Sequence, residues 1–300
     1  MRTLMLALGF TLLLAGCGKP EVAPTPPVVP PTPPATNTDD RFGLVGINTY
    51  PGCPLQGCVN DIQNVKTYIT KDLGFSPDKV RVLTNEEATT ANIFELLAWL
   101  IKDAKAGDRR YFHYSGHGAE FAGRDLEKQP DGMNQVICPV DFDWTPEHMI
   151  MDVDFVNLFK TIPSGVLFNF ASDSCHSGDL IKAVSKKGIR PKQYPLVPEA
   201  VKTQLAKARV AKLKPKGFVG GLLDVGFVSG CRYDQTSADT QEDGQPCGAM
   251  TYFYLQVLRA KKDAPLTEIV KEMNVRLSAY GYEQQPQAEG ARAGKPLLKP

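Results

Sequence analysis

From Arg41 onward, short apolar runs alternate with longer stretches in which apolar residues recur at helical spacing. The apolar runs favour β-strands and lie at residues 42–50, 79–84, 109–116, 165–171 and 226–230. The amphipathic stretches favour helices and lie at 60–72, 90–104 and 152–162. This alternation predicts an α/β fold, with a mostly parallel sheet of roughly six strands and helices on both faces.

Two of the predicted helices have a clear apolar stripe. Residues 90–104 place apolar side chains at i, i+3, i+4, i+7 and i+8, and residues 152–162 repeat this spacing behind Asp152, a candidate N-cap. Each stripe is expected to pack on the sheet.

The residues before Arg41 do not belong to this pattern. Residues 1–16 combine one Arg with an apolar run too short to cross a bilayer, so they predict an export signal. The sequence Leu-Ala-Gly-Cys that ends at Cys17 resembles the lipobox of bacterial lipoproteins, which implies lipidation of Cys17 and attachment to the cell envelope, with Gly18 favouring the outer membrane. An ordinary secretory signal is the alternative. Residues 17–40 are rich in proline and predict an extended tether that reaches up to roughly 60 Å.

Composition is that of an ordinary globular protein, with 42% hydrophobic and 22% charged residues in a chain of 300. The net charge of +1 conceals one asymmetry, because residues 182–216 hold eleven Lys or Arg and a single acid, Glu199. This basic segment has two interpretations, a solvated flexible loop or a linker that the protein cuts.

Polar side chains gather where two predicted neighbouring strands end. Residues 111–118 read YFHYSGHG and residues 168–178 read FNFASDSCHSG. Side chains alternate along a strand, so Ser115 and His117 share one side, as do Asp173 and Cys175. Parallel sheets place their sites at the carboxyl ends of strands, so these four groups are expected to converge.

Cys175 is the candidate nucleophile in this group, and His117 is the candidate base. An imidazole beside a thiol lowers the thiol pKa and can later protonate a departing amine. The main-chain N–H groups of Gly118 and Cys175 are candidate donors to an oxyanion. Of the other histidines, His113 is expected inside the sheet layer, His148 in a loop without a predicted partner, and His176 pointing away from Cys175.

A disulfide and a metal are the other interpretations of Cys175. Exported proteins often form disulfides between their cysteines. For the same reason, disulfides between Cys53 and Cys58 or between Cys231 and Cys247 are possible. Zinc is disfavoured, because the chain has no C-x-x-C pair to complete a closed site.

Five segments together resemble the ordered motifs of metacaspases, the cysteine peptidases related to caspases. They are LQGCVND at 55–61, SGHG at 115–118, CPVDF at 138–142, DSCHSG at 173–178 and SGCRYDQTSA at 229–238, and QPQAEG at 285–290 is similar to the family's last strand. Five linked motifs in family order are far more specific than one Cys and one His.

The resemblance implies a caspase-like peptidase domain over residues 41–300 that cleaves after Arg or Lys with a His117–Cys175 dyad. Its parts would be a large-subunit-like region at 41–181, the linker at 182–216 and a small-subunit-like region at 217–300. The residues that match the family's substrate pocket are Cys58, Asp61, Ser115 and Asp173. Two carboxylates in a partly dry pocket favour a cationic guest. The expected partners are therefore polypeptides with Arg or Lys before the cut, with no nucleic acid and a monomeric enzyme; Lys186, Lys187, Arg190 or a neighbour is the candidate site of self-cleavage.

Calcium, which the family often needs, is disfavoured here. The positions that resemble its ligands read Asn134, Asp152, Val153 and Lys182, and calcium prefers several anionic oxygens. The chain is expected to need no cofactor, although Asp131, Asp141, Asp143 and Asp179 leave a displaced site open.

Two rival functions remain at this point. One is a catalytically silent envelope scaffold whose basic segment binds anionic partners. The other is a clostripain-like or legumain-like peptidase of the same fold, which would fit the dyad but not the LQGC and QTSA segments.

Overall fold

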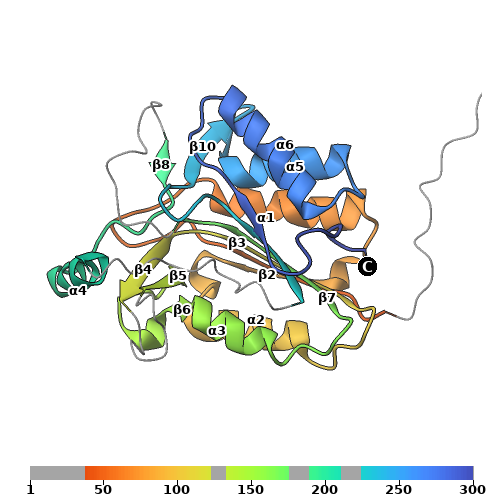
Figure 1. Ribbon diagram of the computed structural model, residues 1–300, viewed down its shortest axis with the longest axis horizontal. Coiled ribbons are helices and arrows are strands. Elements are labelled where there is room, and N and C mark those ends of the chain that lie inside the picture. Colours follow the sequence, from red (N-terminus) through yellow and green to blue (C-terminus); the bar gives the residue numbers. More distant parts are fainter. Residues whose placement is uncertain (1–37, 123–132, 176–188, 211–223, 300) are drawn as a thin grey trace, which may run out of the picture. The chain divides into compact units, whose positions relative to one another are not determined.

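The computed structural model describes residues 38–122, 133–175, 189–210 and 224–299 (Figure 1). The export signal, Cys17 and nearly all of the proline-rich tether lie outside these residues, as do Asp131, His176, Asp179, Lys182, Lys186 and Lys187. Among the described helices, none is both long and apolar enough to cross a membrane.

A six-stranded sheet forms the centre of the fold, with the strand order β12-β9-β7-β3-β1-β2. Its strands are β1 (Arg41–Gly46), β2 (Val80–Thr84), β3 (Arg109–Ser115), β7 (Leu167–Asp173), β9 (Val225–Ser229) and β12 (Gln287–Glu289). Five strands run parallel, and only the edge strand β12 runs antiparallel to its neighbour. The predicted mostly parallel sheet is confirmed.

Helices cover both faces of this sheet (Figure 1). On one face lie α2 (Thr90–Ile101) and α3 (Asp152–Phe159), and on the other lie α1 (Cys58–Thr67), α5 (Ala249–Ala260) and α6 (Leu266–Ala279). The stripe predicted for α2 is buried in the core of its face. Single turns of 3-10 or π geometry occupy Tyr68–Asp72, Pro77–Lys79, Asn85–Glu87 and Pro146–His148.

The start of α3 differs from the prediction by one residue. The N-cap is Met151, and Asp152 is the first residue of the helix. The carboxylate that accepts the Met151 main-chain N–H belongs to Asp154, at 2.9 Å, so the acid that caps this helix lies inside its first turn.

Two small antiparallel sheets extend the fold beside the ends of β3 and β7. One contains β4 (Gly118–Ala122), β5 (Met133–Ile137) and β6 (Ile150–Met151), and the other contains β8 (Arg190–Pro191), β10 (Ala238–Glu242) and β11 (Gln245–Gly248). β4 begins three residues after β3 ends, so the turn between them carries His117.

The described part of the basic segment is ordered. Residues 190 and 191 form β8, and α4 (Glu199–Val210) follows, with Val201 and Leu205 buried against Phe121 and Trp144. The interpretation of this segment as a solvated loop is therefore wrong for its described residues. Val201 and Leu205 are four residues apart, so they share the face of α4 that packs on Phe121 and Trp144.

Candidate active site

The two polar strand ends lie side by side, as the sequence predicts. β3 and β7 pair in parallel, and their register places Ser115 directly opposite Asp173. The carboxyl end of the sheet thereby brings a hydroxyl and a carboxylate to one point, where the N-termini of α1 and α5 also arrive.

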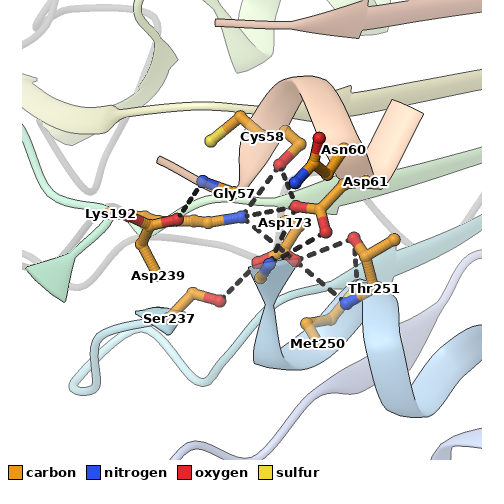
Figure 2. Close-up of polar contacts among 12 residues, drawn as sticks. Gly57, Cys58, Asn60, Asp61, Asp173, Lys192, Ser237, Asp239, Met250 and Thr251 are labelled. Atoms are coloured by element: carbon orange, nitrogen blue, oxygen red, sulfur yellow. Dashed lines mark hydrogen bonds and ion pairs between the residues drawn. The ribbon is translucent and has the colours of Figure 1, made fainter. Parts of the chain in front are cut away.

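Asp61 and Asp173 form the walls of a closed polar pocket at this point (Figure 2). The Ser115 hydroxyl donates to Asp61 Oδ2 at 2.7 Å, and the Gly248 N–H donates to the same carboxylate at 2.8 and 3.0 Å. Asp173 accepts from the Ser237 hydroxyl at 2.6 Å and from the Thr251 N–H at 2.9 Å. Because Thr251 lies in the first turn of α5, the helix N-terminus stabilises the Asp173 charge.

Lys192, a residue of the chain's own basic segment, fills this pocket. Its ammonium group lies 2.8 Å from Ser115 Oγ, 3.2 Å from Asp61 Oδ2 and 3.2 Å from Asp173 Oδ2, and its side chain is fully buried (Figure 2). An ammonium has three hydrogens to donate, and each has an acceptor here. The pocket therefore holds a lysine side chain with all its hydrogen bonds made.

Charge in the pocket is balanced by this lysine. Burial raises the pKa of Asp61 to about 7, Lys192 opposes the rise and Asp173 adds to it. Burial would also raise the pKa of Asp173, but Lys192, Ser237 and Thr251 bring it below its usual range. The Lys192 ammonium is thus the charge that lets two carboxylates share this buried pocket.

Cys58, the fourth residue that the sequence assigns to the pocket, contributes a neutral thiol. It is fully buried at the start of α1, and burial raises its pKa above the usual thiol value, although Lys192 and the Ser115 hydroxyl oppose the rise. The structure therefore gathers all four predicted pocket residues, Cys58, Asp61, Ser115 and Asp173, around one cation.

Gly248 closes the pocket from the α5 side. A Cβ atom at this position would lie 2.1 Å from Asp173 Oδ2, 2.2 Å from Lys192 Nζ and 2.7 Å from Asp61 Oδ2. These contacts are too short for any side chain, so only glycine leaves room for the cation.

His117 is held in the turn between β3 and β4 by three groups. Its Nε2 lies 2.8 Å from the Cys53 carbonyl, its main-chain N–H donates to the Tyr50 hydroxyl at 3.0 Å, and the Tyr50 ring packs on the imidazole at 4.5 Å. Burial lowers the pKa of His117 to about 4, although the carbonyls of Cys53 and Lys192 oppose this decrease. Nδ1 is buried and makes no hydrogen bond, so a neutral imidazole keeps one nitrogen unused.

The predicted oxyanion donors both point to the same carbonyl group. The Gly118 N–H donates to the Lys192 carbonyl at 2.8 Å and the Cys175 N–H donates to it at 3.4 Å. The main chains of the His117 turn and of Cys175 therefore meet at the carbonyl of the residue whose side chain fills the pocket. This is the position that an oxyanion hole must hold.

Cys175 is fully buried beneath this carbonyl. Burial raises the pKa of its thiol, whereas the sequence predicts that a neighbouring imidazole lowers it. The physical reason is burial: the thiol is fully buried and His117 is only 2% exposed. Residues 190–196, called the strap from here on, contribute to it, because the Lys192 carbonyl accepts the Cys175 N–H and the Tyr194 ring packs on the imidazole at 5.6 Å. In this sealed state both groups are neutral.

The other described histidines differ in their partners. His113 is fully buried, as expected, and lies 2.8 Å from the Tyr111 hydroxyl and 3.2 Å from Thr251 Oγ1. His148 was expected to have no partner, but its Nδ1 lies 2.8 Å from Asp143 Oδ2 on the surface. Neither ring makes a hydrogen bond to Cys175, and the predicted pair of His117 and Cys175 is not hydrogen-bonded in this structure either, because Nε2 of His117 is on the Cys53 carbonyl and Nδ1 has no partner.

Several residues of the site were not predicted from the sequence. Ser237 lies in the QTSA segment, so its place was foreseeable, but Gly248 and Thr251 carry no local signal. Asp239 accepts the N–H groups of Gln56 and Gly57 at 2.9 and 2.8 Å and so fixes the start of α1. Lys192 could not be chosen among eleven similar cations.

Of the four positions that resemble calcium ligands, the three that the structure describes, Asn134, Asp152 and Val153, supply few anionic oxygens. Among all the described residues no three His, Cys, Asp or Glu side chains come together in a possible metal site. Asn134 has a buried side-chain oxygen without a hydrogen bond, and Asp152 supplies one carboxylate, but Val153 supplies no side-chain oxygen. Asp141 is bonded to Thr90 and Asp143 to Thr145. One amide and one carboxylate are too few for a cation that takes six to eight oxygens.

The six cysteines of the described residues are free thiols. The possible pairs Cys53–Cys58 and Cys231–Cys247 are therefore not formed in this structure, and Cys58 stays in the pocket.

The fold and the site together define a class of protein, the caspase-like cysteine peptidases, and comparisons with known proteins agree. The sequence-family model described as "Metacaspase, peptidase C14 domain" matches residues 42–184 of this chain. Metacaspase-1 of Scheffersomyces stipitis is 31% identical over 285 residues, which cover 81% of this chain and 68% of that protein. Metacaspase-1 of Emericella nidulans is 32% identical over 282 residues, with the same two coverages.

A crystal structure of a protein from Geobacter sulfurreducens has the same fold, with a TM-score of 0.61 and 23% identity over 87% of this chain and 98% of that one. The chain belongs to the metacaspase family. It is a hydrolase, a cysteine-type endopeptidase. This membership accounts for the five sequence motifs that resemble the family.

Proposed function

We propose that this peptidase cuts polypeptides after Lys or Arg, with Cys175 as the nucleophile and His117 as the base. The observation that carries the proposal is Lys192. Its side chain fills the pocket of Asp61 and Asp173, and its carbonyl accepts the N–H groups of Gly118 and Cys175. A lysine held at both its side chain and its carbonyl is bound as the residue before a scissile bond would be.

The reaction follows from the groups that surround this carbonyl. The unused Nδ1 of His117 takes the proton of the Cys175 thiol, and the sulfur forms a bond to the carbonyl carbon. The Gly118 and Cys175 N–H groups hold the oxyanion, which collapses as the C–N bond breaks and the imidazolium gives its proton to the leaving amine. Water then hydrolyses the thioester and releases the acid.

The strap acts as a tethered substrate in this proposal. Its Lys192–Gln193 bond is the bond presented to Cys175, so the segment that the sequence marks as a self-cleavage linker is cut here. Arg190 lies two residues earlier, in β8, and its guanidinium is half exposed, 3.9 Å from Asp239. Another polypeptide enters only when the strap leaves the pocket.

The proposed place of action is the bacterial envelope, through a lipidated Cys17 and the proline-rich tether, with the enzyme a monomer that binds no nucleic acid. Its support is the sequence alone. Replacing Cys17 with Ser should move the enzyme from the membrane fraction to the soluble periplasmic fraction, and an unchanged distribution would contradict the anchor.

The test of the proposed specificity is removal of the Asp173 carboxylate. Loss of one partner of a buried charge pair costs about 3 to 5 kcal/mol, so Asp173→Ala should lower kcat/KM on lysyl and arginyl peptides by about 100-fold or more. Asp173→Asn keeps the volume and should show a loss of the same order, while the surface variant Asp143→Asn should behave as the wild type. Near-normal turnover by folded Asp173→Asn would exclude the assignment.

Labelling separates the peptidase from a silent scaffold. A lysyl chloromethylketone should attach to Cys175 in the wild type, and free lysine in excess should slow the attachment. A folded protein in which Cys175 is not labelled by this reagent would contradict the proposed function as a whole.

A further inference from the structure

The strap continues past Lys192 along the free edge of β4. The Tyr194 N–H donates to the Gly118 carbonyl at 2.8 Å, and Gln193 pairs with Gly118 in parallel. β4 bonds β5 on its other side, so its outer edge is open to one more strand. The residues that follow the scissile bond are therefore bound as an added β-strand, in a fixed register.

This register brings the Tyr194 ring into a box of aromatic side chains. The ring centre of Phe142 lies at 4.8 Å, that of Trp144 at 6.0 Å and that of Tyr50 at 6.2 Å, and all three contacts are edge-to-face. The imidazole of His117 closes the box at 5.6 Å. Tyr194 is only 7% exposed, so the box encloses almost the whole residue.

The walls of this box are held by contacts that do not involve Tyr194. The Tyr50 hydroxyl donates to the Cys138 carbonyl at 2.8 Å, and Phe142 packs on Trp144 at 5.0 Å. These contacts remain when Tyr194 leaves, so the Tyr50 and Phe142 walls are preformed for the residue of another polypeptide.

Trp144 also holds the main chain two residues further on. Its indole N–H donates to the Leu196 carbonyl at 2.7 Å, which fixes the direction in which the chain leaves the box. The contacts after the scissile bond therefore extend over four residues, 193–196.

We infer that Tyr50, Phe142 and Trp144 form a second specificity subsite, which selects an aromatic residue at the second position after the cut. The inference rests on the proposed function, because it takes Lys192 as the residue before the scissile bond. Edge-to-face contacts with several rings favour Tyr, Phe or Trp over an aliphatic side chain of similar volume. The enzyme should thus recognise Lys or Arg, any residue, then an aromatic residue.

Three substrates test this inference in the full-length mature enzyme. Two quenched peptides differ only at the second position after the cut, Lys-Gln-Tyr-Pro-Leu and Lys-Gln-Ala-Pro-Leu, and the third is a lysyl aminocoumarin with no residue beyond the dye. The measured quantity is the ratio of kcat/KM for the Tyr and Ala peptides in one preparation. The strap must leave the site before either peptide binds, and this step lowers kcat/KM for both peptides by the same factor. The factor therefore cancels from the ratio.

The wild type should prefer the Tyr peptide by about tenfold or more. Trp144→Ala should bring this ratio close to one, and Trp99→Ala is the matched control, because Trp99 packs on Arg81 and Arg41 outside the box. A wild-type ratio near one overturns the subsite even if the variant fails to fold. Turnover of the aminocoumarin with such a ratio leaves the proposed function intact, whereas no turnover of any lysyl substrate overturns both.

Discussion

At the residue scale, the pocket depends on a position that has no side chain. Gly248 approaches two carboxylates and the bound ammonium, all within 2.7 Å of where its Cβ would lie. Gly248→Ala should therefore displace the cation and lower kcat/KM on lysyl substrates by about 100-fold, because the buried charge pair is opened. The measurement is turnover of a lysyl aminocoumarin by each purified variant.

Gly294→Ala is the control for this change, since a Cβ atom there meets nothing within 4 Å. It should retain wild-type turnover. Full activity of Gly248→Ala, with an unfolding midpoint like that of the control, would show that the lysyl side chain binds elsewhere.

The sequence allowed some residues of the site to be predicted and not others. Alternation along β3 and β7 correctly predicted that Ser115 and Asp173 lie close together, because strand periodicity is a local property, while their exact register comes from the structure. Lys192 and Gly248 come from distant segments, and only the folded sheet brings them to the pocket. The raised pKa of Cys175 was missed for the same reason, since the burial of its thiol depends on segments that are distant in the sequence, the strap among them.

At the element scale, the strands of the central sheet and the helices α1, α2 and α3 were readable, whereas the strap and α4 were not. α6 carries an apolar stripe of Leu266, Ile269, Val270, Met273 and Leu277, and its spacing would have supported a prediction. Among the described side chains of α4, up to residue 207, Val201 and Leu205 are the buried ones, so the basic composition favoured a loop. β8 has two residues and, within the described part of the chain, pairs with β10, which no local pattern reveals.

The residues between β5 and α3 determine whether the activity depends on calcium. Of the positions there that resemble calcium ligands, the described ones offer one carboxylate, that of Asp152, and the amide of Asn134, while Asp154 is bonded to the Met151 N–H. We therefore expect kcat/KM on a lysyl peptide to be the same with a calcium chelator as with added calcium. An enzyme that chelator inactivates and calcium restores would contradict this expectation.

At the scale of the whole molecule, two buried neutral histidines make folding sensitive to acid. Burial lowers the pKa of His113 to about 3 and of His117 to about 4, from 6.5. Below pH 6.5 these histidines are protonated in the unfolded chain but not in the folded protein. Their contribution to the free energy of unfolding is therefore fully present above pH 6.5 and is lost as the pH falls toward the folded pKa values. Asp61, with its raised pKa, has the opposite effect in this window but counts for one proton against two.

His113→Gln isolates one of these protons without touching the proposed dyad. The variant's free energy of unfolding should fall less steeply with acid, by about 1.4 kcal/mol per pH unit between roughly pH 6.5 and 4. Urea unfolding of both proteins across this range gives the two slopes. Parallel slopes would mean that His113 is protonated in the folded protein.

The central claim is that the chain presents its own Lys192–Gln193 bond to Cys175. Intact-mass analysis and mapping of the new chain ends, on purified wild type beside Cys175→Ala and Lys192→Ala, test it most directly. The wild type should separate between Lys192 and Gln193, and both variants should stay whole at that bond. An uncut wild type, or a Cys175→Ala protein cut to the same extent, would contradict the account.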